Sequence, residues 1–191
     1  MSWLSDYLRD VRRYTTYSEG WALTQILTQQ GLWALLQYRL TAAVYRSGLP
    51  FAVKRALLLV LVIWQKIVEV STGICLPYTA RIGPGLYLGH FGNIIVNGDA
   101  VIGSNCNLSQ GVTIGVSGRR ERRGVPRVGD RVYFGANAVA AGKITIGDDV
   151  IIGGNSLATA DVPPHCTVVG VPAVIVSDKG SEEYICLEGT I

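Results

Sequence analysis

Charge is scarce in this chain. Only 16% of its 191 residues are charged, and the net charge is +3. Five arginines lie in a single segment, residues 116–127, so the remainder of the chain is close to neutral. Nucleic-acid binding usually requires a broad basic surface with interleaved aromatic side chains. We therefore expect no nucleic-acid partner.

Cysteine is also sparse, and its spacing carries no motif. The four cysteines form neither a CxxC pair nor a zinc-ligand pattern, so we expect all four to be reduced and no metal to be bound. The N-terminus is charged and lacks the apolar stretch and cleavage site of a signal peptide, which indicates a cytoplasmic location. The cysteines are Cys75, Cys106, Cys166 and Cys186.

Long hydrophobic runs are absent as well. The apolar run 56–64 is far shorter than the roughly 20 residues with which a helix spans a bilayer. Lys54, Arg55 and Lys66 bracket this run. Two interpretations stay open: a buried helix at an oligomer interface, or a peripheral contact of residues 51–70 with the inner face of the membrane.

What the sequence does contain is a repeat of six residues. An apolar residue recurs at every sixth position, and a second small or branched residue follows each one four positions later. The leading positions are Val128, Phe134, Ala140, Ile146, Ile152 and Ala158, and the following ones are Val132, Ala138, Ile144, Val150, Ser156 and Val162. A helix repeats near 3.6 residues and a half-buried strand at 2, so a period of six indicates a solenoid.

In such a solenoid each hexapeptide forms one side of a prism, and three sides make one coil. Residues 18 apart then stack at the spacing of paired strands. Glycine follows four of the leading positions, at Gly129, Gly135, Gly147 and Gly153. We expect these glycines, together with Asn and Asp residues, at the corners, where the chain needs positive φ or an Asx turn.

The repeat has two irregularities. It begins near Ile82 and Leu88, shifts by two residues, and runs in step from Val96 to Val116. Residues 116–127 then carry no periodicity, which predicts an extended loop.

The sequence divides into three parts. Residues 1–73 show helical spacing of apolar side chains and are expected to serve oligomerisation or membrane contact. Residues 74–176 form the hexapeptide domain, and 177–191 form a C-terminal tail. We expect Pro163, Pro164 and Pro172 to stop regular structure.

Only two histidines are available for acid–base chemistry. His90 lies next to the two-residue shift, where a side chain can turn outward, and imidazole suits a general base at neutral pH. His165 follows two prolines, and we interpret it as structural or solvent-facing.

The segments YLGHFGNIIVNGDAVIGSNCNLSQGVTIG and DVPPHCTVVGVPAVIV, within this repeat, closely resemble the hexapeptide-repeat acyltransferases, and among them the serine acetyltransferase family. The resemblance implies a mainly β fold, a left-handed parallel β-helix with an N-terminal α-helical region. It also implies a homotrimer, with a dimer of trimers as the alternative assembly, and acetyl transfer from acetyl-CoA to a hydroxyl group. The catalytic residue is then His90, which takes the hydroxyl proton and returns one to the thiolate.

The resemblance also implies the cofactor contacts. Main-chain contacts to CoA fall near Gly115, Ala136 and Gly154. Its phosphates need cations, which Lys143 or the arginines of the loop can supply. The loop arginines are Arg119, Arg120, Arg122, Arg123 and Arg127.

Three family positions differ here. The carboxylate that pairs with the catalytic histidine falls on Ile74 or Cys75, an Asp on Gly89, and a second histidine on Val125. His90 must then be oriented by another group, such as a main-chain carbonyl or Tyr78. The last two losses favour a sugar hydroxyl in polysaccharide biosynthesis as acceptor. L-serine, as in cysteine biosynthesis, is the alternative, and an amine is a lesser one.

Two other classes are weighed against this enzyme. A non-catalytic solenoid scaffold is consistent with the lost carboxylate. A zinc enzyme of the carbonic anhydrase type needs three histidine ligands, whereas this chain has two at opposite ends of the solenoid, so we disfavour it.

Overall fold

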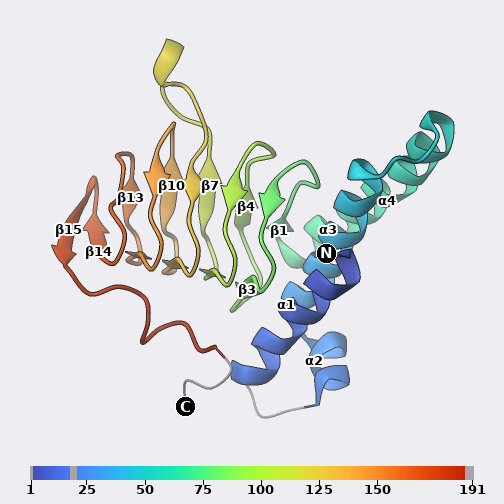
Figure 1. Cartoon of the computed structure of the whole chain (residues 1–191), viewed down its shortest axis with the longest axis horizontal. Coiled ribbons are helices and arrows are strands. Elements are labelled where there is room, and N and C mark those ends of the chain that lie inside the picture. The colour runs from blue at the N-terminus through green and yellow to red at the C-terminus, as the bar shows by residue number, and fades with distance from the viewer. Residues whose placement is uncertain (1, 18–20, 188–191) are drawn as a thin grey trace.

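The computed structural model describes residues 2–17 and 21–187. Four helices come first along the chain and lie at one end of a column of short strands (Figure 1). They are α1 (Trp3–Tyr17), α2 (Ala22–Thr28), α3 (Gln30–Arg46) and α4 (Phe51–Thr72).

The strands form three sheets whose strands pair in parallel, apart from the last pair. Sheet A contains β1 (Ile74–Cys75), β4 (Ile94–Val96), β7 (Thr113–Gly115), β10 (Val139–Ala141) and β13 (Leu157–Ala158). Sheet B contains β2 (Arg81–Ile82), β5 (Val101–Ile102), β8 (Arg127–Val128) and β11 (Thr145–Ile146). Sheet C contains β3 (Tyr87–Leu88), β6 (Asn107–Leu108), β9 (Tyr133–Phe134), β12 (Ile151–Ile152), β14 (Thr167–Gly170) and β15 (Ala173–Ser177).

The chain visits sheets A, B and C in turn, so each circuit is one coil of a three-sided β-helix. The predicted inward positions form its core. Phe134, Ile146 and Val150 are fully buried, and so is Cys106, which stands where a small apolar residue is needed. The period of six thus predicted the hexapeptide architecture and its core correctly.

The pairing register locates both irregularities of the repeat. Regular coils pair residues 18 apart, as Val139 with Leu157. The first coil pairs Ile74 with Ile94, 20 apart, because it contains the two-residue shift beside His90. Thr113 pairs with Val139, 26 apart, so the loop adds eight residues to its coil.

The prediction of positive φ at the corners was correct for Asn and Asp residues but wrong for the four glycines. Gly129, Gly135, Gly147 and Gly153 all lack positive φ. Instead, positive φ recurs at non-glycine residues of other corner positions: Asn105, Arg131, Asn137, Asp149 and Asn155. A Cβ on Gly135 would lie 2.6 Å from the backbone nitrogen of Gly154. Glycine is therefore needed there because successive coils approach too closely for a side chain.

The expectation that the prolines stop regular structure was also wrong. β14 and β15 follow Pro163 and Pro164 and pair as an antiparallel hairpin, with Pro172 in the connection. This hairpin ends the column on the side opposite the helices (Figure 1). Beyond it, the chain returns along sheet C, where the amide of Ser181 donates to the carbonyl of Asp149.

The other end of the column is covered by side chains of α1 and α3. Strands β2 and β3 have no strand on their outer side, so their backbone groups need other partners. The hydroxyl of Tyr38 donates to the carbonyl of Ala80 and accepts from the amide of Ile82. The hydroxyl of Tyr14 bonds both the amide and the carbonyl of Leu88.

A buried ion pair completes this cover. Arg39 binds both carboxylate oxygens of Asp10, at 2.8 and 2.9 Å, and also donates to the carbonyls of Ile82 and Gly83. Asp10 in turn accepts from the amides of Gly85 and Leu86. Asp10 is 0% exposed, so its charge depends on these donors.

Helix α4 is covered on one side only. Gln65, Val68 and Thr72 are buried, whereas the other side exposes apolar residues. The exposed ones include Val53, Leu57, Val60, Ile63, Ile67 and Val70. Within the described ranges, no helix is long and apolar enough to cross a membrane.

We predict that Arg39→Ala lowers the free energy of unfolding by about 3–5 kcal/mol, because it leaves the Asp10 carboxylate buried without its partner. Urea unfolding measures this. Arg12→Ala removes an exposed arginine from the same end of the chain and should change stability by less than about 0.5 kcal/mol. Equal stability of the two variants would contradict the role of the ion pair.

We also predict that Gly135→Ala destabilises the protein by about 1–3 kcal/mol, because the atoms in its way are backbone and cannot move aside. Gly48→Ala is the matched control, since a Cβ there meets nothing within 4 Å. Thermal unfolding of both variants compares the two. A Gly135→Ala protein as stable as the control would show that the coils can separate without cost.

Candidate functional site

His90 lies at the corner where the chain passes from sheet C to sheet A, which we call the C–A corner. It follows β3 directly, and its side chain is exposed. Tyr14 fixes the backbone of Leu88 on one side, and the amide of Gly92 donates to the carbonyl of Thr72 on the other. The register shift at His90 is thus held by both the first and the last helix.

A pocket of about 450 Å³ lies beside His90 and is walled by tyrosines. Tyr17 stacks on Tyr87 with ring centroids 4.3 Å apart, and Tyr133 meets Tyr184 at 5.2 Å. Besides His90, Cys186 and the tyrosine hydroxyls, the polar groups of this pocket are those of Asn107, Ser109 and Glu183. Its lining contains no Lys or Arg among the residues that the structure describes.

The tyrosine wall was not predicted from the sequence. Tyr17 comes from α1 and Tyr184 from the C-terminal segment, whereas Tyr87 and Tyr133 occupy outward positions of the repeat. The amide of Asn107 donates to the Tyr17 hydroxyl at 2.8 Å, and Tyr17 donates to the carbonyl of Tyr184. The repeat places Tyr87 and Tyr133 at outward positions, but that placement alone does not distinguish them from other surface residues.

The predicted CoA contacts fall on two different corners. Ala136 and Gly154 lie on the C–A corner, in later coils than His90. Gly115 ends β7, and Lys143 lies in the turn after β10, so both border the corner from sheet A to sheet B, which we call the A–B corner. Within one chain the two groups therefore lie along opposite edges of sheet A.

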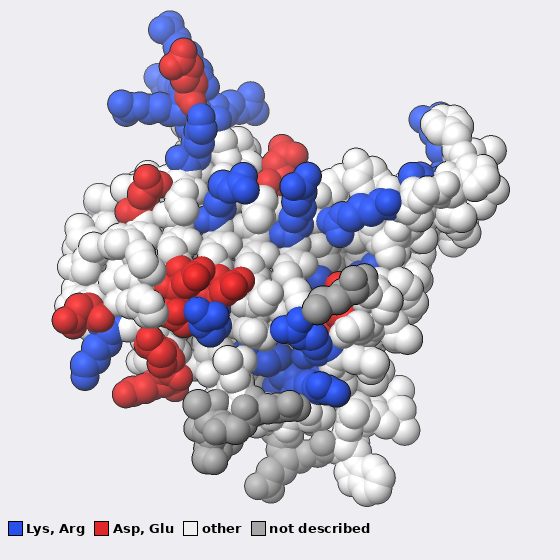
Figure 2. Space-filling model, viewed as in Figure 1, with Lys and Arg blue, Asp and Glu red and all other residues white. Residues whose placement is uncertain are grey.

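The extended loop also leaves from the A–B corner, after β7, and stands out from the column (Figure 1). Figure 2 shows it as a mostly basic projection. Its base is closed by backbone hydrogen bonds between Ser117 and Gly124, and its tip is a short 3₁₀ helix, Arg120–Arg122. Arg119, Arg120, Arg122 and Arg123 are exposed there, whereas Arg127 lies in β8 on the face of sheet B.

Cys75 is one of the two positions, with Ile74, on which the family carboxylate falls, and a carboxylate reaches it from α4. The Cys75 thiol donates to Oε1 of Glu69 at 3.3 Å. Burial and the neighbouring Glu69 raise the pKa of Cys75 to about 11, so the thiol stays protonated at neutral pH. Burial acts to raise the pKa of Glu69, but hydrogen bonds from Lys66, Gln65 and Cys75 bring it below its usual value.

Within one chain, Tyr78 does not orient His90. Tyr78 lies before β2 on the A–B corner and packs edge-on against Tyr45, with ring centroids 5.1 Å apart. Among the described residues, no hydrogen bond to the His90 imidazole is found. His165 is exposed and lies 3.2 Å from Oε1 of Glu182, as expected for a solvent-facing imidazole.

The four cysteines are free, as expected, and no group of three or more His, Cys, Asp or Glu in the described part of the chain is arranged to hold a metal ion. The site therefore offers an exposed imidazole, a tyrosine-walled pocket, and two edges of small residues along sheet A. An imidazole so placed can remove a proton from a hydroxyl group held in the pocket.

Comparison with known proteins agrees with this geometry. The family described as bacterial transferase hexapeptide (six repeats) matches residues 126–159. A serine acetyltransferase of Helicobacter pylori (strain J99) is 34% identical over 152 residues, which cover 80% of this chain and 84% of the relative. This chain belongs to the serine acetyltransferase family.

Other members of the serine acetyltransferase family match over most of this chain. The enzyme of Synechococcus elongatus is 32% identical over 158 residues, 83% of this chain, but the chain spans only 62% of that relative's length. The crystal structure of serine acetyltransferase from Brucella abortus strain S19 in complex with coenzyme A has a TM-score of 0.78 at 26% identity. That match covers 93% of this chain and 69% of the other.

We predict that Cys75→Asp, which installs the carboxylate implied at this position, lowers the free energy of unfolding by about 1–3 kcal/mol near neutral pH, because it faces the charge of Glu69. Urea unfolding measures the loss, which should shrink at acidic pH as the carboxyl groups are protonated. Cys75→Ser keeps a donor for Glu69 and is the control. A fully stable Cys75→Asp protein would mean that Glu69 moves away freely.

Proposed function

We propose that the protein is an acetyl-CoA-dependent O-acetyltransferase in which His90 is the general base. His90 takes the proton of the acceptor hydroxyl as its oxygen attacks the thioester carbonyl of acetyl-CoA. The tetrahedral intermediate collapses with loss of the CoA thiolate, which takes up a proton from the imidazolium. The observation that carries the proposal is the exposed position of His90 at the register shift, next to a pocket, in a chain of this family.

The proposal includes a homotrimer of left-handed β-helices. The outward positions of sheet A carry no charge: they are Cys75, Ile95, Thr113, Gly115, Val139, Ala141 and Leu157. A face without charge can pack against other copies. A threefold arrangement of sheet A brings the C–A corner of one copy next to the A–B corner of its neighbour. His90, Ala136 and Gly154 of one subunit then line a CoA groove together with Gly115 and Lys143 of the next.

In this groove the small residues leave backbone accessible to the narrow pantetheine arm. Gly154 is exposed, and a Cβ there would lie 3.2 Å from the carbonyl of Ala136. Lys143 and the exposed arginines at the loop tip, Arg119, Arg120, Arg122 and Arg123, are the cations available for the diphosphate and 3′-phosphate. Arg127 lies instead in β8, on the face of sheet B. The coenzyme A complex of the Brucella relative supports acetyl-CoA as the donor.

The comparisons favour L-serine as the acceptor, since the relatives are named serine acetyltransferases. This departs from our expectation of a sugar, which the names of the relatives do not support. One structural observation keeps a sugar hydroxyl as the second candidate. The tyrosine-walled pocket contains no Lys or Arg to pair with the carboxylate of a free amino acid.

We predict that His90→Ala lowers the rate of acetyl transfer by roughly 10²–10⁴-fold, because the base is lost while the fold is kept. Thiol release from acetyl-CoA measures the rate, with L-serine in one arm and a panel of sugars and nucleotide sugars in the other. His165→Ala, on the far side of the column, is the matched control and should retain full activity.

The acceptor whose thiol release falls in the His90→Ala variant identifies the substrate class. Undiminished release in His90→Ala would overturn the assignment of the base. Calorimetry without measurable CoA binding to the wild type would instead indicate a non-catalytic scaffold.

A further inference from the structure

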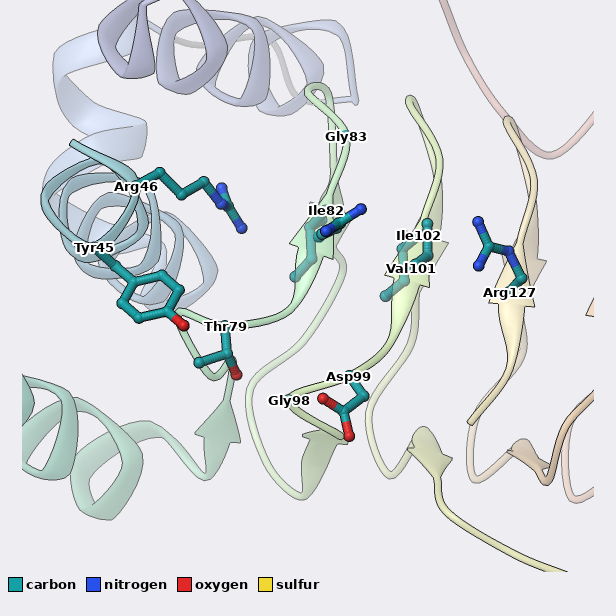
Figure 3. Close-up of a pocket in the computed structure, with 11 residues that line it drawn as sticks. Tyr45, Arg46, Thr79, Ile82, Gly83, Gly98, Asp99, Val101, Ile102 and Arg127 are labelled. Carbon is teal, nitrogen blue, oxygen red and sulfur yellow. The ribbon is translucent and has the colours of Figure 1, made fainter. Parts of the chain in front are cut away.

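A second hollow, of about 980 Å³, lies on the outer face of sheet B. Three arginines from distant parts of the chain line it: Arg46 near the end of α3, Arg81 in β2 and Arg127 in β8. Figure 3 shows Arg46 and Arg127 reaching toward each other from the two sides of β2 and β5. The proposed acetyl transfer does not use this hollow.

The arginines are held apart by the fold and are poorly neutralised. Arg81 and Arg127 both lie in register with Val101, so their Cα atoms are about two strand spacings, roughly 10 Å, apart. Arg46 donates to the carbonyl of Ala80 at 2.6 Å, which fixes it over the sheet. The backbone amides of Arg81 and Arg127 donate within the coils, but within residues 2–17 and 21–187 neither guanidinium group has a hydrogen-bond or ion-pair partner.

One acidic side chain, Asp99, also lines the hollow. It lies in the turn between β4 and β5, where its amide donates to the side chain of Asn97. It forms no ion pair with the three arginines in the described structure, so the lining keeps a net charge of two positive units. Figure 2 shows Lys and Arg gathered along this part of the surface.

We propose that this hollow binds a phosphate or diphosphate ester through Arg46, Arg81 and Arg127. Guanidinium groups bind phosphate oxygens with paired, charge-assisted hydrogen bonds, and the lining charge matches that of a phosphate dianion. The hydroxyl of Thr79 supplies a further donor on the same lining.

The phosphate can come from a soluble ester or from a lipid headgroup, and the same chemistry serves both. Helix α4 begins at Phe51, close in sequence to Arg46, and exposes Val53 and Leu57. The experiment therefore tests both sources with separate probes.

The test uses the full chain saturated with CoA, so that the proposed CoA groove is filled. Pyrophosphate is titrated by calorimetry in one arm. In the other arm the protein is sedimented with vesicles of phosphatidylcholine, with and without phosphatidylglycerol. Arg81→Gln removes an exposed cation. It should weaken binding about tenfold, either to pyrophosphate if the ligand is a soluble ester or to the vesicles if it is a lipid headgroup.

Two further variants sharpen the test. Arg12→Gln removes an exposed arginine of α1 and should leave binding unchanged. Asp99→Asn removes the opposing charge and should strengthen binding roughly threefold. Melting temperatures confirm that each variant is folded.

Loss in the pyrophosphate arm supports a soluble phosphate ester, and loss in the vesicle arm alone supports a lipid headgroup. Equal behaviour of Arg81→Gln and Arg12→Gln in both arms would overturn the proposal. Acetyl transfer by Arg81→Gln should equal that of the wild type, so failure of this site and failure of the proposed activity are distinguishable.

Discussion

The open edge of the first coil is the constraint on which the rest of the structure depends. Every later coil finds its hydrogen bonds on the coil before it, but β2 and β3 have no preceding strand. Tyr14 and Tyr38, together with the Asp10–Arg39 pair, take the place of that missing coil. Side chains thereby end the sheets without leaving an edge to which another chain could add a strand.

The same cover links the helices to the corner that contains His90. Tyr14 binds the backbone two residues before His90, and the end of α4 binds Gly92 two residues after it. Regular coils pair residues 18 apart, whereas the first coil pairs residues 20 apart and contains His90 at its extra bend. The two extra residues create this bend, and the helices hold it in one conformation.

Periodicity predicted the platform well, because inward positions such as Phe134 and Ile146 are set by local spacing alone. It also predicted the loop, because residues 116–127 interrupt the period of six. It failed where a residue's role depends on a distant segment. The need for glycine at position 135 comes from the next coil, and the hairpin β14–β15 forms in spite of nearby prolines because sheet C offers its edge. The tyrosine wall joins α1, two coils and the C-terminal segment, so no local pattern could reveal it.

On the proposed function, different parts of the chain supply the base and the walls of the acceptor pocket. The proposed base and the CoA groove belong to the repeat, whose geometry any chain with the same period shares. The pocket beside His90 instead takes Tyr17 from α1 and Tyr184 from the tail, both outside the repeat. Replacement of these flanking segments changes the shape and charge that an acceptor meets, while the hydroxyl still approaches the same imidazole. On the proposed function, the acceptor therefore depends on the flanking segments as well as on repeat residues such as Gly89 and Asn107, which line the same pocket.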